Sequence, residues 1–258
     1  MLQVYPDHAD LGDAALAARY AYPGPATAGQ VWLRANMVSS LDGAATAAGR
    51  SGGLSGEADR QVFALLRALA DVVLVGAGTV RAEGYRPARA TAGPRWAWLR
   101  EGRPPAPPIA VVTRALDLDT GTPLFTGAPP YARTIVVTTG SAPAGRRAAA
   151  ARTADVIVAG DDGVDLATAL DELASRGHRR ILCEGGPHLL AQLAGAGLVD
   201  ELCLTLSPVL AGPGAGRIVA GGPPPVGGAP QPFALAHALA DEEYLLCRYV
   251  RRGGRVRP

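Results

Sequence analysis

Residues 180–190, Arg-Ile-Leu-Cys-Glu-Gly-Gly-Pro-His-Leu-Leu, constrain the fold more than any other stretch of this sequence. The apolar residues 181–183 predict a buried strand, and Pro187 is a typical first residue of a helix. The two intervening glycines let the backbone approach a ligand closely, and the helix N-terminus favours an anion. This pattern predicts a phosphate-binding turn of an α/β protein, with Glu184 facing the same crevice. An ordinary strand-to-helix turn is the alternative interpretation.

Two further segments predict strands that end beside this turn. An apolar strand at 72–75 leads into Gly76-Ala77-Gly78, and a strand at 109–112 is followed by Thr113 and Arg114. Parallel strands bring their carboxyl ends to one edge of the sheet, where α/β proteins bind ligands. A hydroxyl and a guanidinium suit a phosphate monoester, such as the 2′-phosphate that distinguishes NADP from NAD. A surface Thr-Arg pair is the alternative.

A helix is expected at 56–70, after a Gly-rich loop at 49–53 that either covers a ligand or is a plain surface connection. Ser55 is positioned to cap this helix, and an apolar stripe marks its buried side. Arg67 lies off that stripe near the helix's carboxyl end. It is expected either to complement the helix dipole or to bind a ligand.

The chain as a whole predicts an α/β fold with a mixed, mostly parallel sheet of about eight strands flanked by helices. With 258 residues, 48% of them hydrophobic, it can bury one substantial core. We expect an N-terminal extension at 1–29 with a short helix near 11–20, one domain at 30–252, and a tail at 253–258. Residues 244–250 should form an antiparallel strand at an edge.

Composition excludes several classes of function. The sequence contains no lysine, which removes Schiff-base, pyridoxal and P-loop chemistry. Its basic residues are spread along a chain of net charge +2, so no nucleic-acid partner is expected. Three distant cysteines and four scattered histidines lack metal-ligand spacing and predict no metal site, while reduced cysteines indicate the cytoplasm. No signal peptide or membrane-spanning segment is expected.

Four motifs in order resemble the reductase domain of the bifunctional riboflavin-biosynthesis deaminase/reductase. They are Asn-Met-Val-Ser-Ser-Leu-Asp-Gly at 36–43, Leu-Arg-Ala-Leu-Ala-Asp-Val-Val-Leu-Val-Gly-Ala-Gly-Thr-Val-Arg-Ala-Glu at 66–83, Ile-Leu-Cys-Glu-Gly-Gly-Pro-His-Leu-Leu at 181–190, and Gly-Leu-Val-Asp-Glu-Leu at 197–202. The resemblance runs from about residue 31 to residue 250. It implies a dihydrofolate reductase-like fold, a homodimer, and an NADPH-dependent oxidoreductase that passes a hydride to C1′ of a phosphoribosylamino pyrimidine, as in 5-amino-6-(5-phosphoribosylamino)uracil reductase.

The resemblance also implies site residues, carried over by position. The cofactor site would comprise Val38, Ser40, Gly78, Thr79, Glu83, Thr113, Arg114, Gly185, Gly186, Pro187, His188, Leu189 and Leu190. The substrate site would comprise Asp42, Ser51, Arg67 and Glu184, and Arg86 would replace part of a phosphate-gripping motif that this chain lacks. Glu184 is also the candidate catalytic proton relay, with water as the equal alternative.

The zinc-deaminase motifs of the family, His-x-Glu and Pro-Cys-x-x-Cys, are absent from the sequence, so deamination by that chemistry is not expected. Two alternatives to the pyrimidine reductase stay open. Reduction of dihydrofolate or another pterin would be favoured by a carboxylate low in an apolar pocket, whereas Arg67 and a surviving phosphate grip favour the phosphosugar. The altered motif also permits a catalytically silent NADP-binding protein.

Overall fold

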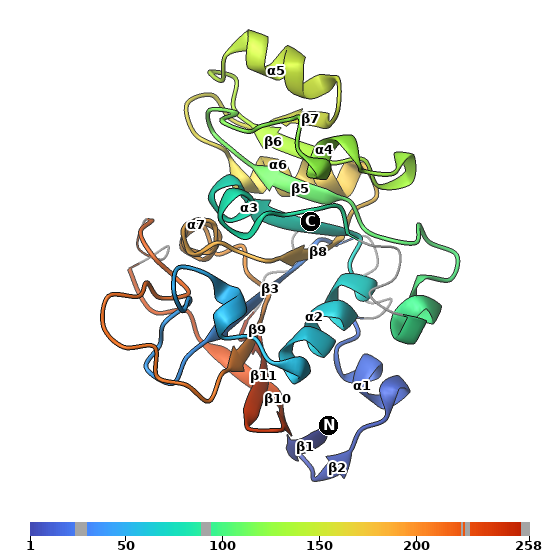
Figure 1. Cartoon of the computed structure of the whole chain (residues 1–258), viewed down its shortest axis with the longest axis vertical. Helices are drawn as coiled ribbons and strands as arrows, with labels where there is room; N and C mark the ends of the chain where they lie inside the picture. The colour runs from blue at the N-terminus through green and yellow to red at the C-terminus, as the bar shows by residue number, and fades with distance from the viewer. Residues whose placement is uncertain (24–29, 89–93, 223, 225–227, 254–258) are drawn as a thin grey trace.

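The computed structural model describes residues 1–23, 30–88, 94–222, 224 and 228–253. A single sheet of eleven strands runs through the molecule in the order β2-β1-β10-β11-β9-β3-β8-β4-β5-β6-β7 (Figure 1). Strands β9, β3, β8, β4, β5, β6 and β7 pair in parallel, and the remaining pairs are antiparallel.

The strands are β1 (Leu2–Tyr5), β2 (Ala9–Asp10), β3 (Trp32–Ser39), β4 (Val72–Gly76), β5 (Ile109–Val112), β6 (Ile135–Thr138), β7 (Asp155–Val158), β8 (Arg180–Cys183), β9 (Glu201–Leu206), β10 (Phe233–Asp241) and β11 (Tyr244–Arg251). The α-helices are α1 (Asp13–Arg19), α2 (Glu57–Leu69), α3 (Ala77–Glu83), α4 (Pro123–Thr126), α5 (Ala144–Ala151), α6 (Leu166–Ser175) and α7 (Pro187–Gly195). Short 3₁₀ turns are η2 (Ser51–Gly53), η3 (Pro94–Arg100) and η4 (Pro130–Ala132).

The parallel strands are apolar on both faces because helices cover both sides of the sheet. Along β4, Val73 and Val75 pack into the hydrophobic cluster that includes α1, α2, α4 and α5. The alternate residues Val72 and Leu74 pack into the opposite cluster, with α6 and α7. This two-residue alternation fixes the register of the strand, and with it the position of the glycines that follow.

The expected fold class is confirmed, with three more strands than the sequence predicted. Strand β1 pairs with β10 and β2 pairs with β1, so the N-terminal segment extends the sheet. Strand β11 pairs with β10 on one side and β9 on the other, so its expected antiparallel pairing is confirmed and the prediction that it forms an edge is wrong. The domain limits stay predictions, and residues 24–29 and 254–258 lie outside the described part of the chain.

A buried ion cluster fastens the N-terminal segment to the sheet. Arg34 on β3 donates to Glu201 on β9 at 2.5 Å, and both side chains are fully buried. Arg34 also donates to the carbonyl oxygen of Tyr20 at 2.7 Å. Burial raises the pKa of Glu201, but Arg34 and Arg248 outweigh burial and lower the pKa to about 2. The charged cluster therefore joins β3, β9 and β11 to the segment that follows α1.

The three cysteines are buried and unpaired, as expected. None of the helices in the described ranges has the length and apolar character needed to span a membrane.

Candidate active site

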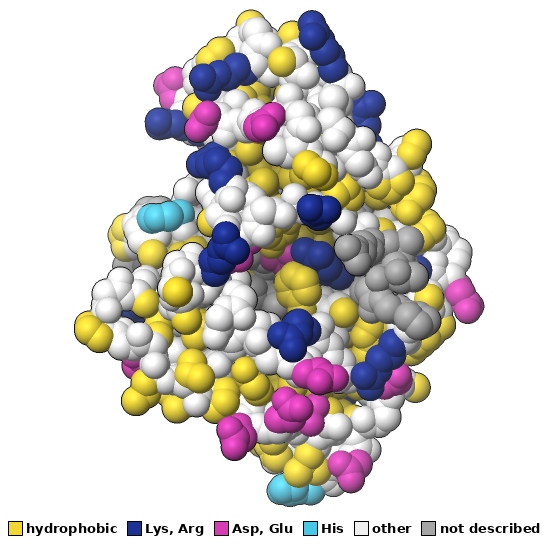
Figure 2. Space-filling model, in the orientation of Figure 1, with side chains coloured by type: hydrophobic (Ala, Val, Ile, Leu, Met, Phe, Trp, Pro, Cys, Tyr) yellow, Lys and Arg dark blue, Asp and Glu magenta, His cyan; other side chains and the backbone are white. Residues whose placement is uncertain are grey.

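The candidate site lies where four parallel strands end. Strand β8 lies between β3 and β4, and β5 flanks β4. The backbone continues this pairing beyond the strands, because Glu184 N donates to the Leu74 carbonyl and Gly76 N donates to the Gly185 carbonyl. The ends of β3, β4, β5 and β8 therefore present their following residues to one crevice. Figure 2 shows a hollow in the middle of this face with basic side chains around it.

The crevice contains two adjoining cavities. The first, of about 630 Å³, lies between β3, α2 and the segment after α3. The second, of about 840 Å³, lies along the ends of β4 and β5 and the start of α7. The side chains that line both are Met37, Ala45, Ser51, Thr79, Glu83 and Glu184. Two molecules, one in each cavity, would thus meet at a shared boundary.

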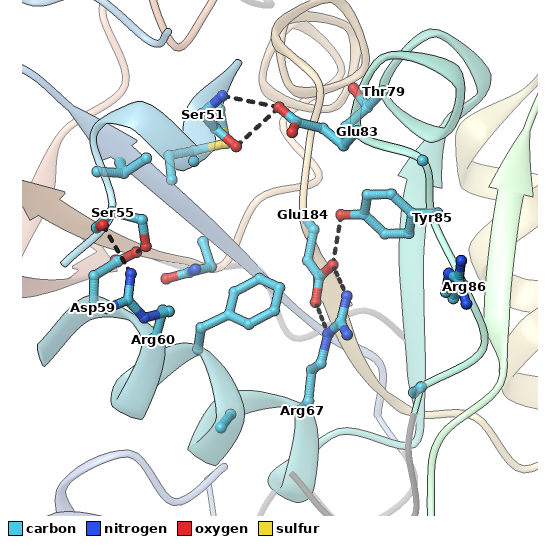
Figure 3. Close-up of a pocket in the computed structure, with 18 of the residues that line it drawn as sticks. Ser51, Ser55, Asp59, Arg60, Arg67, Thr79, Glu83, Tyr85, Arg86 and Glu184 are labelled. Carbon is cyan, nitrogen blue, oxygen red and sulfur yellow. Dashed lines mark hydrogen bonds and ion pairs between the residues drawn. The ribbon is translucent and has the colours of Figure 1, made fainter. Parts of the chain in front are cut away.

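A hydrogen-bonded pair forms part of that boundary. The backbone N–H and the hydroxyl of Ser51 both donate to Glu83 Oε1, at 2.9 and 3.0 Å (Figure 3). Ser51 belongs to η2 in the Gly-rich loop, and Glu83 is the last residue of α3. The loop is therefore held against the helix that follows β4, and it lies over the crevice rather than forming a separate surface connection.

The second cavity contains most of the residues predicted for the cofactor. Its lining includes Gly78, Thr79, Glu83, Thr113, Arg114, Gly186, Pro187, His188 and Leu189. A Cβ atom on Gly186 would lie 2.3 Å from Thr79 Oγ1, whereas one on Gly78 would have nothing within 4 Å. The lack of a side chain at Gly186 thus allows close packing against Thr79, and at Gly78 it leaves the backbone accessible from the cavity. The bare backbone, the start of α7 and the exposed Arg114 suit a molecule that carries phosphates.

A carboxylate, a guanidinium and a phenol meet in the first cavity. Arg67 Nε and Nη2 donate to Glu184 Oε1 and Oε2 at 2.6 and 2.7 Å, and Tyr85 Oη donates to Oε2 at 2.7 Å (Figure 3). The Glu184 side chain is 2% exposed. Burial would lower the pKa of Arg67, but Glu184 outweighs burial and raises it. Burial, followed by the charge on Glu184, raises the pKa of Tyr85 well above its usual value.

Arg67 therefore has a partner that the sequence did not reveal, because Glu184 is 117 positions away. Arg67 also lies in the last turn of α2, where a positive charge complements the helix dipole, as expected. Its guanidinium also lies over the Phe63 ring, 4.4 Å from the ring centroid. The expected cap is wrong: Gly56 is the N-cap of α2 with no side-chain cap, and Ser55 donates to Asp59.

One face of α2 supplies the lining that sequence reasoning missed. Asp59, Phe63 and Arg67 recur every four residues and line the first cavity together with Arg60. Residues four apart lie on the same face of a helix. This i, i+4 spacing beside the apolar stripe is the signal in the sequence that could have identified them. Asn36 of β3 and Tyr85 after α3 also line this cavity without having been predicted.

Four predicted residues line neither cavity: Ser40, Asp42, Gly185 and Leu190. Asp42 accepts from the backbone N–H groups of Ala211 and Gly212, at 3.1 and 2.9 Å. A hydrogen bond from Ser40, followed by these two, lowers the pKa of Asp42 to about 2. The turn after β3 is thus tied to the loop after β9, and the structure gives Ser40 and Asp42 contacts that support these loops. Leu190 packs in the core.

The remaining predicted residues lie where a ligand could reach them. Val38 and Arg86 line the first cavity, and Arg86 is exposed. Within the described ranges its guanidinium makes no hydrogen bond or ion pair, and Arg60 donates only to the Ser55 carbonyl oxygen, at 3.1 Å. Two uncommitted positive charges therefore border this cavity. In the same part of the chain, no three His, Cys, Asp or Glu residues are grouped closely enough to hold a metal ion.

This architecture and cleft define an α/β protein with two adjoining cavities at the carboxyl edge of its sheet. Residues 31–243 match the family described as RibD C-terminal domain, and the chain belongs to that family. It is 31% identical over 178 residues to the 2,5-diamino-6-ribosylamino-4(3H)-pyrimidinone 5′-phosphate reductase of Archaeoglobus fulgidus, covering 69% of this chain and 80% of that protein. The corresponding protein of Methanothermobacter thermautotrophicus is 32% identical over 178 residues, covering 69% of this chain and 77% of that protein.

Solved structures share the fold. A pyrimidine reductase-like protein from Corynebacterium diphtheriae superposes with a TM-score of 0.77 at 24% identity, covering 92% of this chain and 98% of that one. RibD of Acinetobacter baumannii superposes with a TM-score of 0.70 at 22% identity. The match covers 86% of this chain and 58% of RibD, so this chain corresponds to part of that longer protein.

Removing one partner of the Arg67–Glu184 pair should be strongly destabilising. Arg67→Met leaves a buried carboxylate without its cation, and we expect a loss of about 3 to 5 kcal/mol in the free energy of unfolding. The double variant Arg67→Met/Glu184→Gln no longer has an unpaired buried charge, so it should be more stable than Arg67→Met alone. Urea unfolding measures both, with Arg60→Met as the control because Arg60 lines the same cavity without an ion pair. Equal losses for Arg67→Met and Arg60→Met would contradict this interpretation.

Proposed function

We propose that the protein is an NADPH-dependent reductase of a phosphoribosylamino pyrimidine, of the kind used in riboflavin biosynthesis. The observation that carries this proposal is the pair of cavities that adjoin at Ser51, Glu83 and Glu184. Hydride transfer needs two bound molecules with their reacting atoms about 3 to 3.5 Å apart. The names of the two archaeal relatives support a pyrimidinone phosphate as the substrate class.

The protein's main task in this reaction is to hold and orient two molecules. NADPH, when bound, supplies the hydride that C1′ of the ring-opened ribose receives. The second cavity would hold it through the backbone of Gly78 and Gly186, the start of α7, and the side chains of Thr113 and Arg114. The first cavity would hold the pyrimidine against Phe63 and place the phosphate near the uncommitted guanidinium of Arg86.

Glu184 acts in this proposal as a positioning residue. Its carboxylate accepts three hydrogen bonds, from Arg67 twice and from Tyr85 once, so both of its oxygens already have donors. A carboxylate with these three donors fixes the guanidinium of Arg67 and the phenol of Tyr85 in the wall of the first cavity. The geometry therefore favours water over Glu184 as the source of the proton for the sugar oxygen, and the catalytic role first expected for Glu184 stays a prediction.

Dihydrofolate reduction is the second candidate, because one observation favours it. Asp59 places a carboxylate in the first cavity beside Phe63 and Ala64, the feature expected for a pterin. A pterin and an aminopyrimidinone share the same 2-amino-4-oxo edge, so this carboxylate suits both. Arg60 and Arg86 favour the phosphorylated ligand, since a phosphate monoester carries about two charges. The homodimer and the cytoplasmic location stay predictions.

The direct test is oxidation of NADPH, followed by absorbance, with three substrates in parallel. These are the phosphoribosylamino pyrimidine with a 2-amino group, its 2-oxo counterpart, and dihydrofolate. We expect turnover of a phosphoribosylamino pyrimidine and none of dihydrofolate. Tight NADPH binding without turnover of any substrate would contradict the proposal and support a catalytically silent NADP-binding protein.

Preference for NADPH over NADH should depend on Arg114. Arg114 is exposed and lines the second cavity, and its guanidinium makes no hydrogen bond or ion pair among the described residues, so it is free to pair with a 2′-phosphate. We expect Arg114→Ala to weaken NADPH binding about 10- to 100-fold, a typical loss for a charge-assisted pair, and to leave NADH binding almost unchanged. Arg152→Ala is the control, because Arg152 is exposed and lies outside both cavities. Equal losses for both cofactors would remove Arg114 from the 2′-phosphate site.

A further inference from the structure

Asp59 is a buried carboxylate that faces the first cavity. It lies in the first turn of α2, it is 7% exposed, and it belongs to the lining of the cavity. Its hydrogen-bond partner is the hydroxyl of Ser55, which donates to Oδ2 (Figure 3). Nothing in the family resemblance assigns Asp59 a role.

The charge on Asp59 is not matched by a cation. Among the described residues Asp59 forms no ion pair, although its neighbour Arg60 lines the same cavity. Arg60 donates instead to the Ser55 carbonyl oxygen. Oδ1 accepts no hydrogen bond within the described ranges, and Oδ2 keeps a lone pair after the bond from Ser55. A buried carboxylate with spare acceptor capacity is costly unless a ligand supplies the missing donors.

The surroundings of Asp59 select a flat ligand. Phe63, one turn further along α2, and Val38 and Ala64 give this part of the cavity an apolar surface. Asp59 is the carboxylate beside this apolar surface, since Phe63 and Ala64 lie four and five positions further along α2. An aromatic heterocycle that lies against Phe63 would present its edge to the carboxylate.

The two forms of the pyrimidine present different edges to a carboxylate. A 2-aminopyrimidin-4-one offers the exocyclic 2-amino group and the adjacent ring N3–H, two parallel donors that match two carboxylate oxygens. The 2-oxo form offers N3–H beside a carbonyl oxygen, and that oxygen would face a carboxylate oxygen without a proton between them. A site of this kind discriminates by attraction to one edge and repulsion of the other.

We infer that Asp59 is the residue that makes this cavity select a 2-amino pyrimidinone over the 2-oxo form. The inference rests on the proposed function and deepens it, because it specifies which of the two pyrimidines the site takes. The protein would then act on the substrate before any deamination, and the reaction that supplies that substrate must leave the 2-amino group in place. Ser55 positions the carboxylate through Oδ2.

Asp59→Asn is the decisive variant because it preserves size and changes the hydrogen-bonding pattern. The asparagine amide offers one acceptor and one donor, which complement N3–H and the 2-oxo oxygen. We expect kcat/KM for the 2-amino substrate to fall about 10- to 100-fold, the loss of a charge-assisted pair, while kcat/KM for the 2-oxo substrate stays equal or rises. The ratio of kcat/KM for the 2-amino substrate to kcat/KM for the 2-oxo substrate should therefore decrease by at least about 10- to 100-fold.

Glu57→Gln is the matched control. Glu57 is exposed in the same turn of α2 and lines neither cavity, so its loss removes the same charge from the same helix end. It should leave the substrate ratio unchanged. If Asp59 served only the helix dipole and Ser55, Asp59→Asn would lower activity with both substrates in proportion, and that result would overturn the inference.

A binding measurement separates this inference from the proposed reaction. The phosphorylated 2-amino and 2-oxo pyrimidines are titrated calorimetrically into wild-type protein and Asp59→Asn, each saturated with NADP⁺. Selective binding of the 2-amino form that Asp59→Asn abolishes supports the inference even if no NADPH is oxidised, in which case the proposed reaction fails alone. Equal binding of both forms by the wild type overturns the inference even where turnover is observed.

Discussion

The ion pair between Arg67 and Glu184 holds the two halves of the candidate site together. Glu184 follows β8 in the middle of the sheet, and Arg67 comes from α2, which covers one face of that sheet. The Glu184 side chain is 2% exposed and the Arg67 side chain 21%, so moving the guanidinium away would leave a buried carboxylate without its cation. Such a pair adds little net stability, but it fixes the position of α2 relative to the end of β8. Both cavities are built against this fixed point.

The boundary between the cavities joins residues that the family resemblance had assigned to different ligands. Ser51 was expected at the substrate and Glu83 at the cofactor, and in the structure they are hydrogen-bonded to each other. A loop and a helix that meet in this way can orient two ligands toward one another and keep water from the space between them. Ser40 and Asp42 stabilise the neighbouring loops. Ser40 accepts a hydrogen bond from the backbone of Ala44 within the turn after β3, and Asp42 accepts one from Ala211 in the loop after β9.

Local patterns in the sequence predicted the parts of the structure that local physics determines. The apolar runs and glycines around β4 and β8 fixed the strand-turn-helix units, and the shared edge of parallel strands then brought Thr113 and Gly186 to one cavity. Long-range pairing could not be predicted in this way. Strand β1 is short and pairs with β10, more than 200 positions away, and β2 joins the sheet by pairing with β1. Asp59 lies beside Val62 and Leu66 at the margin of the apolar stripe of α2, and helical periodicity alone does not show that a cavity opens there.

The measurement that tests the central claim most directly follows the hydride itself. The protein would be supplied with NADPH deuterated at C4 of the nicotinamide, in separate reactions with each of the two stereospecific labels, and with the 2-amino phosphoribosylamino pyrimidine. The two-cavity account predicts that one of the two labels appears as a single deuterium at C1′ of the product. Product that carries no deuterium at C1′ with either label would contradict direct transfer across the boundary at Ser51 and Glu83.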